Sequence, residues 1–382
     1  MKKGKVAVLD KPNGKFIIKK YPVPDPVPGT LLMKIELCGV CGTDVHTYHG
    51  YMSDAPFPLI LGHEIVGKIF ALGKGTKADF LGKPIKVGDR ITLVPAIHCK
   101  KCFFCTIAKT PSKCVNMVSY GFFPDPDEKH YFTGGYADYL YLFHPETDFF
   151  KISAPPEVAV FTEPLAIAIH AVDRARIKLG DTVLVQGSGT IGLLTLICAK
   201  LAGAGKIIIV SKRRKGRLEL AKKSGADLTI NMEEIPEQEE RIRIVKENSL
   251  SGYGADVVFE CAGVPEAFSE GIKYLRDSAT LCEVGHFADT GSVKINPCLD
   301  ILTKNIRIEG IYDNEPEQFV RAIPILEKGA FPFSDIISHR LPLTRLKEAM
   351  EAITTGAKID DRELVKAVIE PEKGVKEKFK GV

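Results

Sequence analysis

The fold is decided by residues 182–192, which read Thr-Val-Leu-Val-Gln-Gly-Ser-Gly-Thr-Ile-Gly. The apolar run before the first glycine is typical of a buried strand, and residues 190–202 carry a helical pattern. The glycines fit G-x-G-x-x-G at a strand-to-helix turn, the context that this motif requires. Gly187 permits the tight turn, Gly189 lets the backbone approach a pyrophosphate, and Gly192 lets helix and strand pack closely. Because a helix N-terminus also attracts phosphate, the stretch predicts a dinucleotide site; a ligand-free turn is the alternative.

The segments on either side extend this pattern into two kinds of domain. Strand-like segments follow at 206–210, 255–261 and 279–284, with helix-like segments at 215–224 and 265–274. Strands that alternate with helices predict a parallel doubly wound sheet. Near the end of the chain, one more strand is expected at 366–370. Before residue 155, short strands are expected at 6–9, 32–37, 65–72 and 90–95. This first half therefore predicts a β-barrel domain with functional loops.

The residues after the second strand indicate which dinucleotide is bound. A site for NAD usually places Asp or Glu about 20 residues after the glycine loop, where it accepts from the ribose 2′-hydroxyl. Residues 211–215 read Ser-Lys-Arg-Arg-Lys, without an acid. Lys and Arg attract a 2′-phosphate, whereas basic residues at a helix start are unfavourable without an anion. We therefore expect NADP(H) in preference to NAD(H), with a merely basic, exposed helix start as the alternative.

Composition and charge exclude several classes of partner. The 382 residues suggest roughly two domains, and a net charge of +4 is slight for this length. We expect no nucleic-acid or membrane partner. No apolar stretch is long enough for a signal peptide or a bilayer span, so a cytoplasmic location is expected.

Four cysteines form a tight cluster. Cys99, Cys102 and Cys105 are each separated by two residues, and Cys114 follows. Such spacing suits tetrahedral thiolate ligation of zinc better than disulfides in a long chain. All four positions would be filled by protein, so this zinc would be structural; reduced cysteines without metal are the alternative.

A second set of metal-ligand types lies in two glycine-flanked loops. Residues 41–46 read Cys-Gly-Thr-Asp-Val-His, and residues 62–64 read Gly-His-Glu. A catalytic zinc takes about three protein ligands and keeps one position open. A thiol, an imidazole and a carboxylate are therefore available here for such a site.

Taken together, these motifs identify a family resemblance that covers nearly the whole chain. The sequence resembles the zinc-containing medium-chain dehydrogenase/reductase family, including its alcohol and polyol dehydrogenases. Further stretches that carry the likeness are Gly-Gly-Tyr-Ala-Asp-Tyr at 134–139 and Thr-Glu-Pro-Leu at 162–165. The resemblance implies a GroES-like β-barrel catalytic domain at 1–164 with a structural zinc lobe near 96–116, a Rossmann domain at 165–312, and a return to the catalytic domain at 313–382. Eight residues separate Cys105 from Cys114, where the family usually has seven.

The same resemblance assigns roles by motif position. Cys41 and His63 would ligate the catalytic zinc, with Glu64 as a direct or alternating ligand. Glu163 would bind zinc or its water, although a purely structural buried acid is the alternative. Asp44 would orient the ligand histidine, while Thr43 and His46 would relay the alcohol proton. The expected cofactor contacts are Gly187, Gly189, Thr190, Ile191, Gly192, Ser211, Lys212, Arg213 and Arg217.

These roles imply a zinc-dependent enzyme with two zinc ions per chain. We expect hydride exchange between NADP(H) and a secondary alcohol or polyol, or the matching ketone. The glutamate at position 163 supports this substrate class, because the ethanol-type enzymes have a cysteine there. The alternatives are a zinc-free quinone or enoyl reductase and a non-catalytic NADP(H)-binding protein. Family habit suggests a homotetramer or homodimer.

Overall fold

The computed structural model describes residues 2–52, 55–123, 131–212 and 215–373, and the chain divides into two compact units. Unit 1 comprises Met1–Glu163, Asn314–Gly329 and Ile337–Val382. Unit 2 comprises Pro164–Asp313 and Ala330–Ile336. Among the described residues, no helix combines the length and apolarity needed to cross a membrane.

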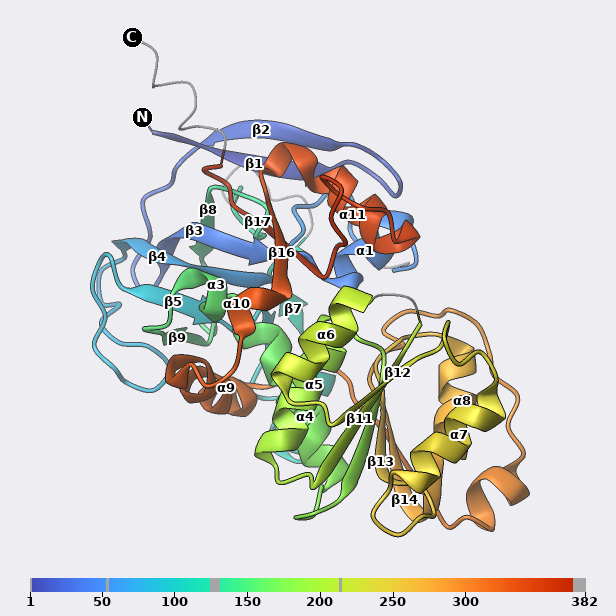
Figure 1. Cartoon of the computed structure of the whole chain (residues 1–382). Helices are drawn as coiled ribbons and strands as arrows, with labels where there is room; N and C mark the ends of the chain where they lie inside the picture. The colour runs from blue at the N-terminus through green and yellow to red at the C-terminus, as the bar shows by residue number, and fades with distance from the viewer. Residues whose placement is uncertain (1, 53–54, 124–130, 213–214, 374–382) are drawn as a thin grey trace. The chain divides into compact units, whose positions relative to one another are not determined.

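Unit 1 is built mainly from strands (Figure 1). Its strands are β1 (Lys3–Leu9), β2 (Phe16–Pro22), β3 (Leu31–Gly39), β4 (Glu64–Leu72), β5 (Arg90–Leu93), β6 (Ala96–Ile97), β7 (Val118–Ser119), β8 (Tyr139–Leu142), β9 (Phe149–Lys151), β16 (Ile337–Leu341) and β17 (Lys366–Ile369). Its helices are α1 (Gly42–His49), α2 (Phe103–Thr106), α3 (Pro156–Ala159), α9 (Pro316–Lys328) and α11 (Leu346–Thr355). The helix α4 (Thr162–Ala175) begins in unit 1 and continues into unit 2.

The main sheet of unit 1 joins the start of the chain to its end. Its described strands run in the order β16-β17-β3-β4-β5-β9, and β8 pairs with β3. In β3, Met33, Ile35 and Leu37 are buried while Lys34 and Glu36 are half-buried, as their alternation predicted. The β17 strand lies antiparallel to β3, with Val368 opposite Gly39. A strand from the end of the chain thus borders the loop that follows β3.

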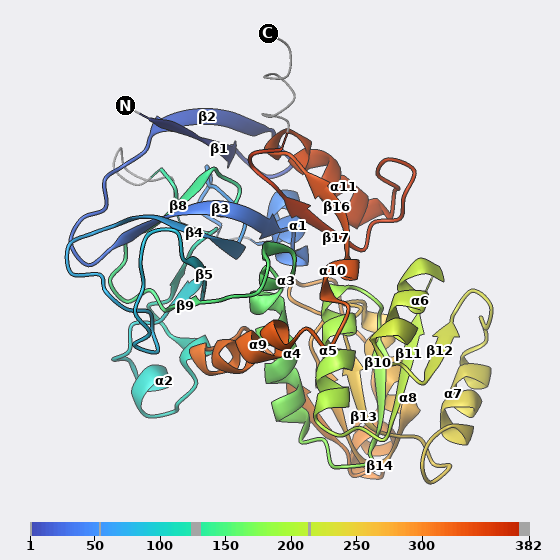
Figure 2. The same ribbon diagram turned by 60° about the vertical axis from the view of Figure 1, so that its left-hand side comes forward.

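Unit 2 is a parallel sheet with helices on both faces (Figures 1 and 2). Its strands are β10 (Thr182–Gln186), β11 (Lys206–Ser211), β12 (Leu228–Asn231), β13 (Ala255–Glu260), β14 (Leu275–Glu283) and β15 (Arg307–Gly310). Its helices are α5 (Thr190–Leu201), α6 (Lys215–Ser224), α7 (Gln238–Glu247), α8 (Pro265–Tyr274) and α10 (Phe333–Ile336). The described strands lie in the order β12-β11-β10-β13-β14-β15. From β10 the chain adds strands first toward one edge of the sheet and then, from β13 on, toward the other edge, as in a Rossmann fold.

Most predicted elements of unit 2 are confirmed. The helices α6 and α8 match the predicted bounds, and β10 follows the quoted stretch residue for residue. Two strands of unit 2, β12 and β15, were not predicted. The β15 strand reads Arg-Ile-Glu-Gly and is largely exposed at the sheet edge, so it carries no hydrophobic pattern.

Candidate functional site

Three side chains with metal-ligand character come together in unit 1. Cys41 immediately precedes α1, His63 lies in the loop before β4, and Glu64 is the first residue of β4. Their ligating atoms lie within 4.8 Å of one another. Sulfur, nitrogen and oxygen donors from three residues are the set found in catalytic zinc sites. The sequence motifs therefore place their ligand types at one point in space.

Asp44 contacts two members of this group, His63 and Cys41. Its side chain is fully buried, and its Oδ1 lies 3.5 Å from Nδ1 of His63. The Gly62 amide donates to Oδ1 (3.2 Å), and the Tyr136 hydroxyl and the Cys41 amide donate to Oδ2 (2.7 and 2.9 Å). Burial alone would raise the pKa of Asp44, but His63 and these donors outweigh it and lower the pKa. An ionised Asp44 can therefore orient the imidazole of His63.

A buried lysine belongs to the same group, although the sequence did not point to it. Lys366, the first residue of β17, is 3% exposed and pairs with the 1%-exposed Glu64. Its Nζ also donates to the Val40 carbonyl at 3.0 Å. Burial would lower the pKa of Lys366, but the surrounding acidic groups, Glu64 foremost and Glu163 among them, raise it.

Glu163 lies in the first turn of α4 and is 7% exposed. It is not among the side chains that gather within 4.8 Å around Cys41. Its Oε1 instead accepts from Nδ2 of Asn314, at 2.7 Å, and Asn314 is fully buried. Sequence reasoning missed this amide, because it lies 151 residues further along the chain.

The two relay candidates are both in α1. Thr43 and His46 are three residues apart, so their side chains lie on one face of the helix. The Cys41 thiol donates to Oγ1 of Thr43 at 3.6 Å. Burial, together with the neighbouring His49, lowers the pKa of His46. A neutral His46 can accept a proton near neutral pH.

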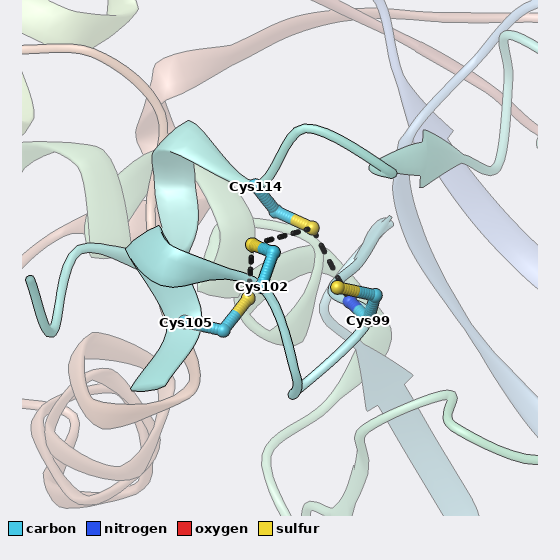
Figure 3. A group of neighbouring side chains, drawn as sticks. All are labelled: Cys99, Cys102, Cys105 and Cys114. Carbon is cyan, nitrogen blue, oxygen red and sulfur yellow. Dashed lines mark hydrogen bonds between the residues drawn. The ribbon is translucent and has the colours of Figure 1, made fainter. Parts of the chain in front are cut away.

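The four clustered cysteines converge on one point (Figure 3). The Cys102 sulfur lies 3.5 Å from that of Cys105 and 3.9 Å from that of Cys114, and the Cys99 amide donates to Cys114 at 3.3 Å. None of the four is in a disulfide. Tetrahedral zinc with bonds of about 2.3 Å would separate its sulfurs by about 3.8 Å. The cluster therefore fits a structural zinc.

A short turn precedes the last cysteine of the lobe. A 3-10 turn at Pro111–Lys113 brings Cys114 back to the cluster. The hydroxyl of Ser112 donates to the Glu315 carboxylate at 3.1 Å, just before α9. This hydrogen bond joins the cysteine lobe to the residue that precedes α9, and both belong to unit 1.

The glycine loop in unit 2 has the geometry that its motif requires. Gly187 has a φ of 95°, which favours glycine, and follows β10 directly. A Cβ on Gly192 would overlap the carbonyl oxygen of Gly187, so helix and strand could not pack as closely. Thr190 and Ile191 open α5, whose N-terminal amides suit a pyrophosphate.

The end of β11 carries a hydroxyl where an acid would favour NAD. Ser211 is buried, and its hydroxyl lies 2.6 Å from that of Ser188 in the glycine loop. Lys212 follows and is exposed, and Nη1 of Arg217 lies 3.9 Å from the place of a Cβ on Gly189. Arg213 lies outside the described residues.

A third cluster, which sequence reasoning did not find, lies at the carboxyl ends of β13 and β14. Nδ1 of His286 lies 2.9 Å from Glu283 and 3.4 Å from the fully buried Glu260. The amides of Ala262 and Gly263 donate to Glu260. Burial, and then Glu283, raise the pKa of Glu260 to about 8. A cavity of about 420 Å³ adjoins Glu283 and His286.

Two family models match the chain. The model described as an alcohol dehydrogenase GroES-like domain matches residues 27–154. The model described as a zinc-binding dehydrogenase matches residues 190–328. The predicted fold class, a GroES-like domain with a Rossmann domain, is therefore confirmed.

Proteins similar to the chain over nearly its whole length include dehydrogenases. The 5-exo-hydroxycamphor dehydrogenase of Pseudomonas putida is 32% identical, over 92% of this chain and 94% of its own. A sorbitol dehydrogenase of Halalkalibacterium halodurans is 31% identical, over 91% and 95%. A putative zinc-binding dehydrogenase of Sinorhizobium meliloti, solved bound to NADP, is 31% identical with a TM-score of 0.82, over 97% and 100%.

Proposed function

The chain belongs to the zinc-containing medium-chain alcohol and polyol dehydrogenase family, and on that premise we propose a zinc-dependent enzyme that uses NADP(H). It is an oxidoreductase of the zinc-type dehydrogenase class with small-molecule substrates. We propose hydride exchange between a secondary alcohol or polyol, or the matching ketone, and NADP(H). The observation that supports this most is the gathering of Cys41, His63 and Glu64 within 4.8 Å.

The proposed catalytic metal is zinc, held by Cys41 and His63. The buried Glu64 and Glu163 are the two candidates for a third ligand. This mixture of donors fits zinc and would leave a position open for substrate. The second zinc would be held by Cys99, Cys102, Cys105 and Cys114.

The residues around the proposed metal divide the remaining work. When bound, zinc lowers the pKa of an alcohol, and the nicotinamide accepts the hydride from its carbon. Thr43 would accept the proton that the alcohol loses as it gives up its own hydroxyl proton toward His46, and His46 would release that proton to solvent. Asp44 keeps His63 in the orientation that a ligand needs. The chain thus supplies binding, orientation and proton transfer.

The preference for NADP(H) rests on the end of β11. Ser211, which contacts the glycine loop, brings no negative charge to repel a 2′-phosphate. Lys212 and Arg217 are two described cations nearby in sequence, and Arg213, which lies outside the described residues, would add a third. One charge-assisted contact contributes about 1.5–3 kcal/mol, which corresponds to about tenfold or more in preference. The Sinorhizobium meliloti relative was solved with NADP, which agrees with this proposal.

The preference for NADP(H) is tested by exchanging charges. Changing Lys212 to Asp and Arg213 to Ile should move the ratio of kcat/KM values toward NAD. A wild-type enzyme with a higher kcat/KM for NAD than for NADP would refute the proposal. The variant Lys246→Asp, at the exposed end of α7, is the matched control and should leave the ratio unchanged.

The proposed substrate class rests on Glu163 and on the relatives. A carboxylate is a harder ligand than the thiolate of ethanol-type enzymes, and it can hold a zinc-bound water. One relative is a 5-exo-hydroxycamphor dehydrogenase, and hydroxycamphor carries its hydroxyl on a ring carbon. Another relative is a sorbitol dehydrogenase, and sorbitol is a polyol. We therefore propose secondary alcohols and polyols over short primary alcohols.

A panel of primary alcohols, secondary alcohols, polyols and their carbonyl products, each with NADP and NAD, tests the substrate class. Clearly higher kcat/KM for simple primary alcohols would contradict it. Glu163→Ala with unchanged zinc content and activity would remove the argument from this residue. Metal analysis beside the same panel separates the zinc-free reductase and the non-catalytic alternatives.

We also propose the arrangement around the site. Residues 1–164 and 313–382 would form the catalytic domain, and residues 165–312 the nucleotide-binding domain. The segment Ala330–Ile336 clusters with unit 2, so the return to the catalytic domain is interrupted there. The proposed assembly is a homotetramer or homodimer, which sedimentation measures. None of the ten cysteines is in a disulfide, which agrees with a reducing cytoplasm.

A further inference from the structure

We propose that Lys366 is a positioning residue that competes with the catalytic metal for Glu64. This inference rests on the proposed function, because it assumes a metal between Cys41 and His63. Lys366 pairs with the Glu64 carboxylate inside the group of potential ligands. Neither the motifs nor the relatives' names assign a role to this lysine.

The Glu64–Lys366 pair is built into the backbone around it. Nζ of Lys366 is anchored by the Val40 carbonyl at 3.0 Å. A Cβ on Gly39 would overlap Oε2 of Glu64 and would stand 3.0 Å from Cε of Lys366. The absence of a side chain at Gly39 therefore leaves the space that the ion pair fills.

Burial makes the pair consequential for a metal. Glu64 is 1% exposed and Lys366 is 3% exposed, so water screens their charges little. A buried ammonium repels a nearby cation, and it also occupies an acceptor that the metal could use. While Lys366 pairs with Oε2 of Glu64, that oxygen is not available as a metal ligand.

This competition has a use in a catalytic site. Structural zinc has four protein ligands, whereas catalytic zinc keeps one position for water or substrate. Lys366 holds a carboxylate that would otherwise fill a position next to Cys41 and His63. The lysine thus favours an open position at the expense of metal affinity.

The competition is tested by measuring how fast the site loses its metal to a chelator. In the time course of metal loss, the phase that reports on this site is the one that is absent from the Cys41→Ser variant. Lys366→Gln removes the charge but keeps N–H donors for the Val40 carbonyl. It should slow this phase by about tenfold or more, the equivalent of one charge-assisted contact. Lys366→Arg keeps the charge and should release metal at the wild-type rate or faster.

A second background separates action through Glu64 from direct repulsion of the metal. In Glu64→Gln protein there is no carboxylate to compete for, so Lys366→Gln should slow metal release much less than in wild type. An equal or larger slowing in that background would mean that Lys366 acts by direct repulsion, and would overturn the proposal.

Two further outcomes would also overturn it: metal release from Lys366→Gln at the wild-type rate or faster, and slower release from Lys366→Arg. The Arg variant keeps the test decisive if the Gln variant does not fold. If wild type oxidises alcohols and shows the Cys41-dependent phase, such results reject the inference alone. If wild type lacks both, the proposed function fails together with it.

Discussion

Oδ1 of Asp44 lies 3.5 Å from Nδ1 of His63, and neither side chain is more than 9% exposed. A carboxylate that contacts one ring nitrogen of a histidine fixes the orientation of the ring, so that the other nitrogen can bind a metal. Asp44→Asn keeps the shape but removes the charge. We expect metal affinity or activity to fall by about 10- to 100-fold.

Metal titration and turnover measured on the same preparation check this prediction. The exposed Asp25→Asn is the matched control and should behave as wild type. Unchanged affinity and unchanged turnover in Asp44→Asn would show that Asp44 serves only to shape the loop.

Removing one sulfur from the cysteine lobe should affect stability more than chemistry. Cys102 contacts the sulfurs of both Cys105 and Cys114, so Cys102→Ser removes one of the four proposed zinc ligands. We expect one zinc fewer per chain and a Tm lower by several degrees, because loss of a structural metal is strongly destabilising. The exposed Cys298→Ser should change neither quantity. An intact Tm in Cys102→Ser would contradict a structural role for the lobe.

His46→Ala should slow alcohol oxidation mainly at neutral and lower pH. Burial and His49 lower the pKa of His46, so the wild-type residue is a neutral proton acceptor there. Without it, proton loss must occur unassisted, and we expect about a 100-fold lower rate that rises again toward alkaline pH. The half-buried His144→Ala is the control. A pH–rate profile with an unaltered shape would remove His46 from the relay.

Glu260 should make unit 2 less stable as pH rises. Its pKa is about 8 in the folded chain against an ordinary value of 4.5, because burial and Glu283 disfavour the charge. Between these values the folded state holds a proton that the unfolded state has lost, so stability falls as pH rises. In Glu260→Gln the side chain at this position does not titrate, so this loss of stability with rising pH is absent. Its Tm relative to wild type should therefore increase from pH 5 to pH 8, as scanning calorimetry would show. A constant Tm difference across that range would mean that Glu260 keeps an ordinary pKa.

Local pattern predicted much of this molecule. The glycine loop, the strand before it and the cysteine cluster are each encoded within a few consecutive residues. Their spacing alone fixes a tight turn or a set of converging sulfurs. Alternating apolar residues likewise predicted β3, because in its middle the buried Met33, Ile35 and Leu37 alternate with the half-buried Lys34 and Glu36.

The contacts that were not predicted join segments far apart in the chain. Lys366 meets Val40 across 326 residues, and Asn314 meets Glu163 across 151. A lysine at the start of an apolar strand gives no sign that it is buried, since most lysines are exposed. The cluster of Glu260, Glu283 and His286 depends on two parallel strands ending side by side, and no local spacing reveals that pairing.

The central claim is that Cys41 and His63 hold a zinc on which alcohol oxidation depends. The most direct test is to measure zinc per chain and NADP-linked oxidation of a secondary alcohol for wild type and Cys41→Ser, with circular dichroism to verify the fold. We predict about two zinc ions in wild type, about one in Cys41→Ser, and loss of oxidation with the fold retained. Full zinc content and full activity in Cys41→Ser would contradict the claim.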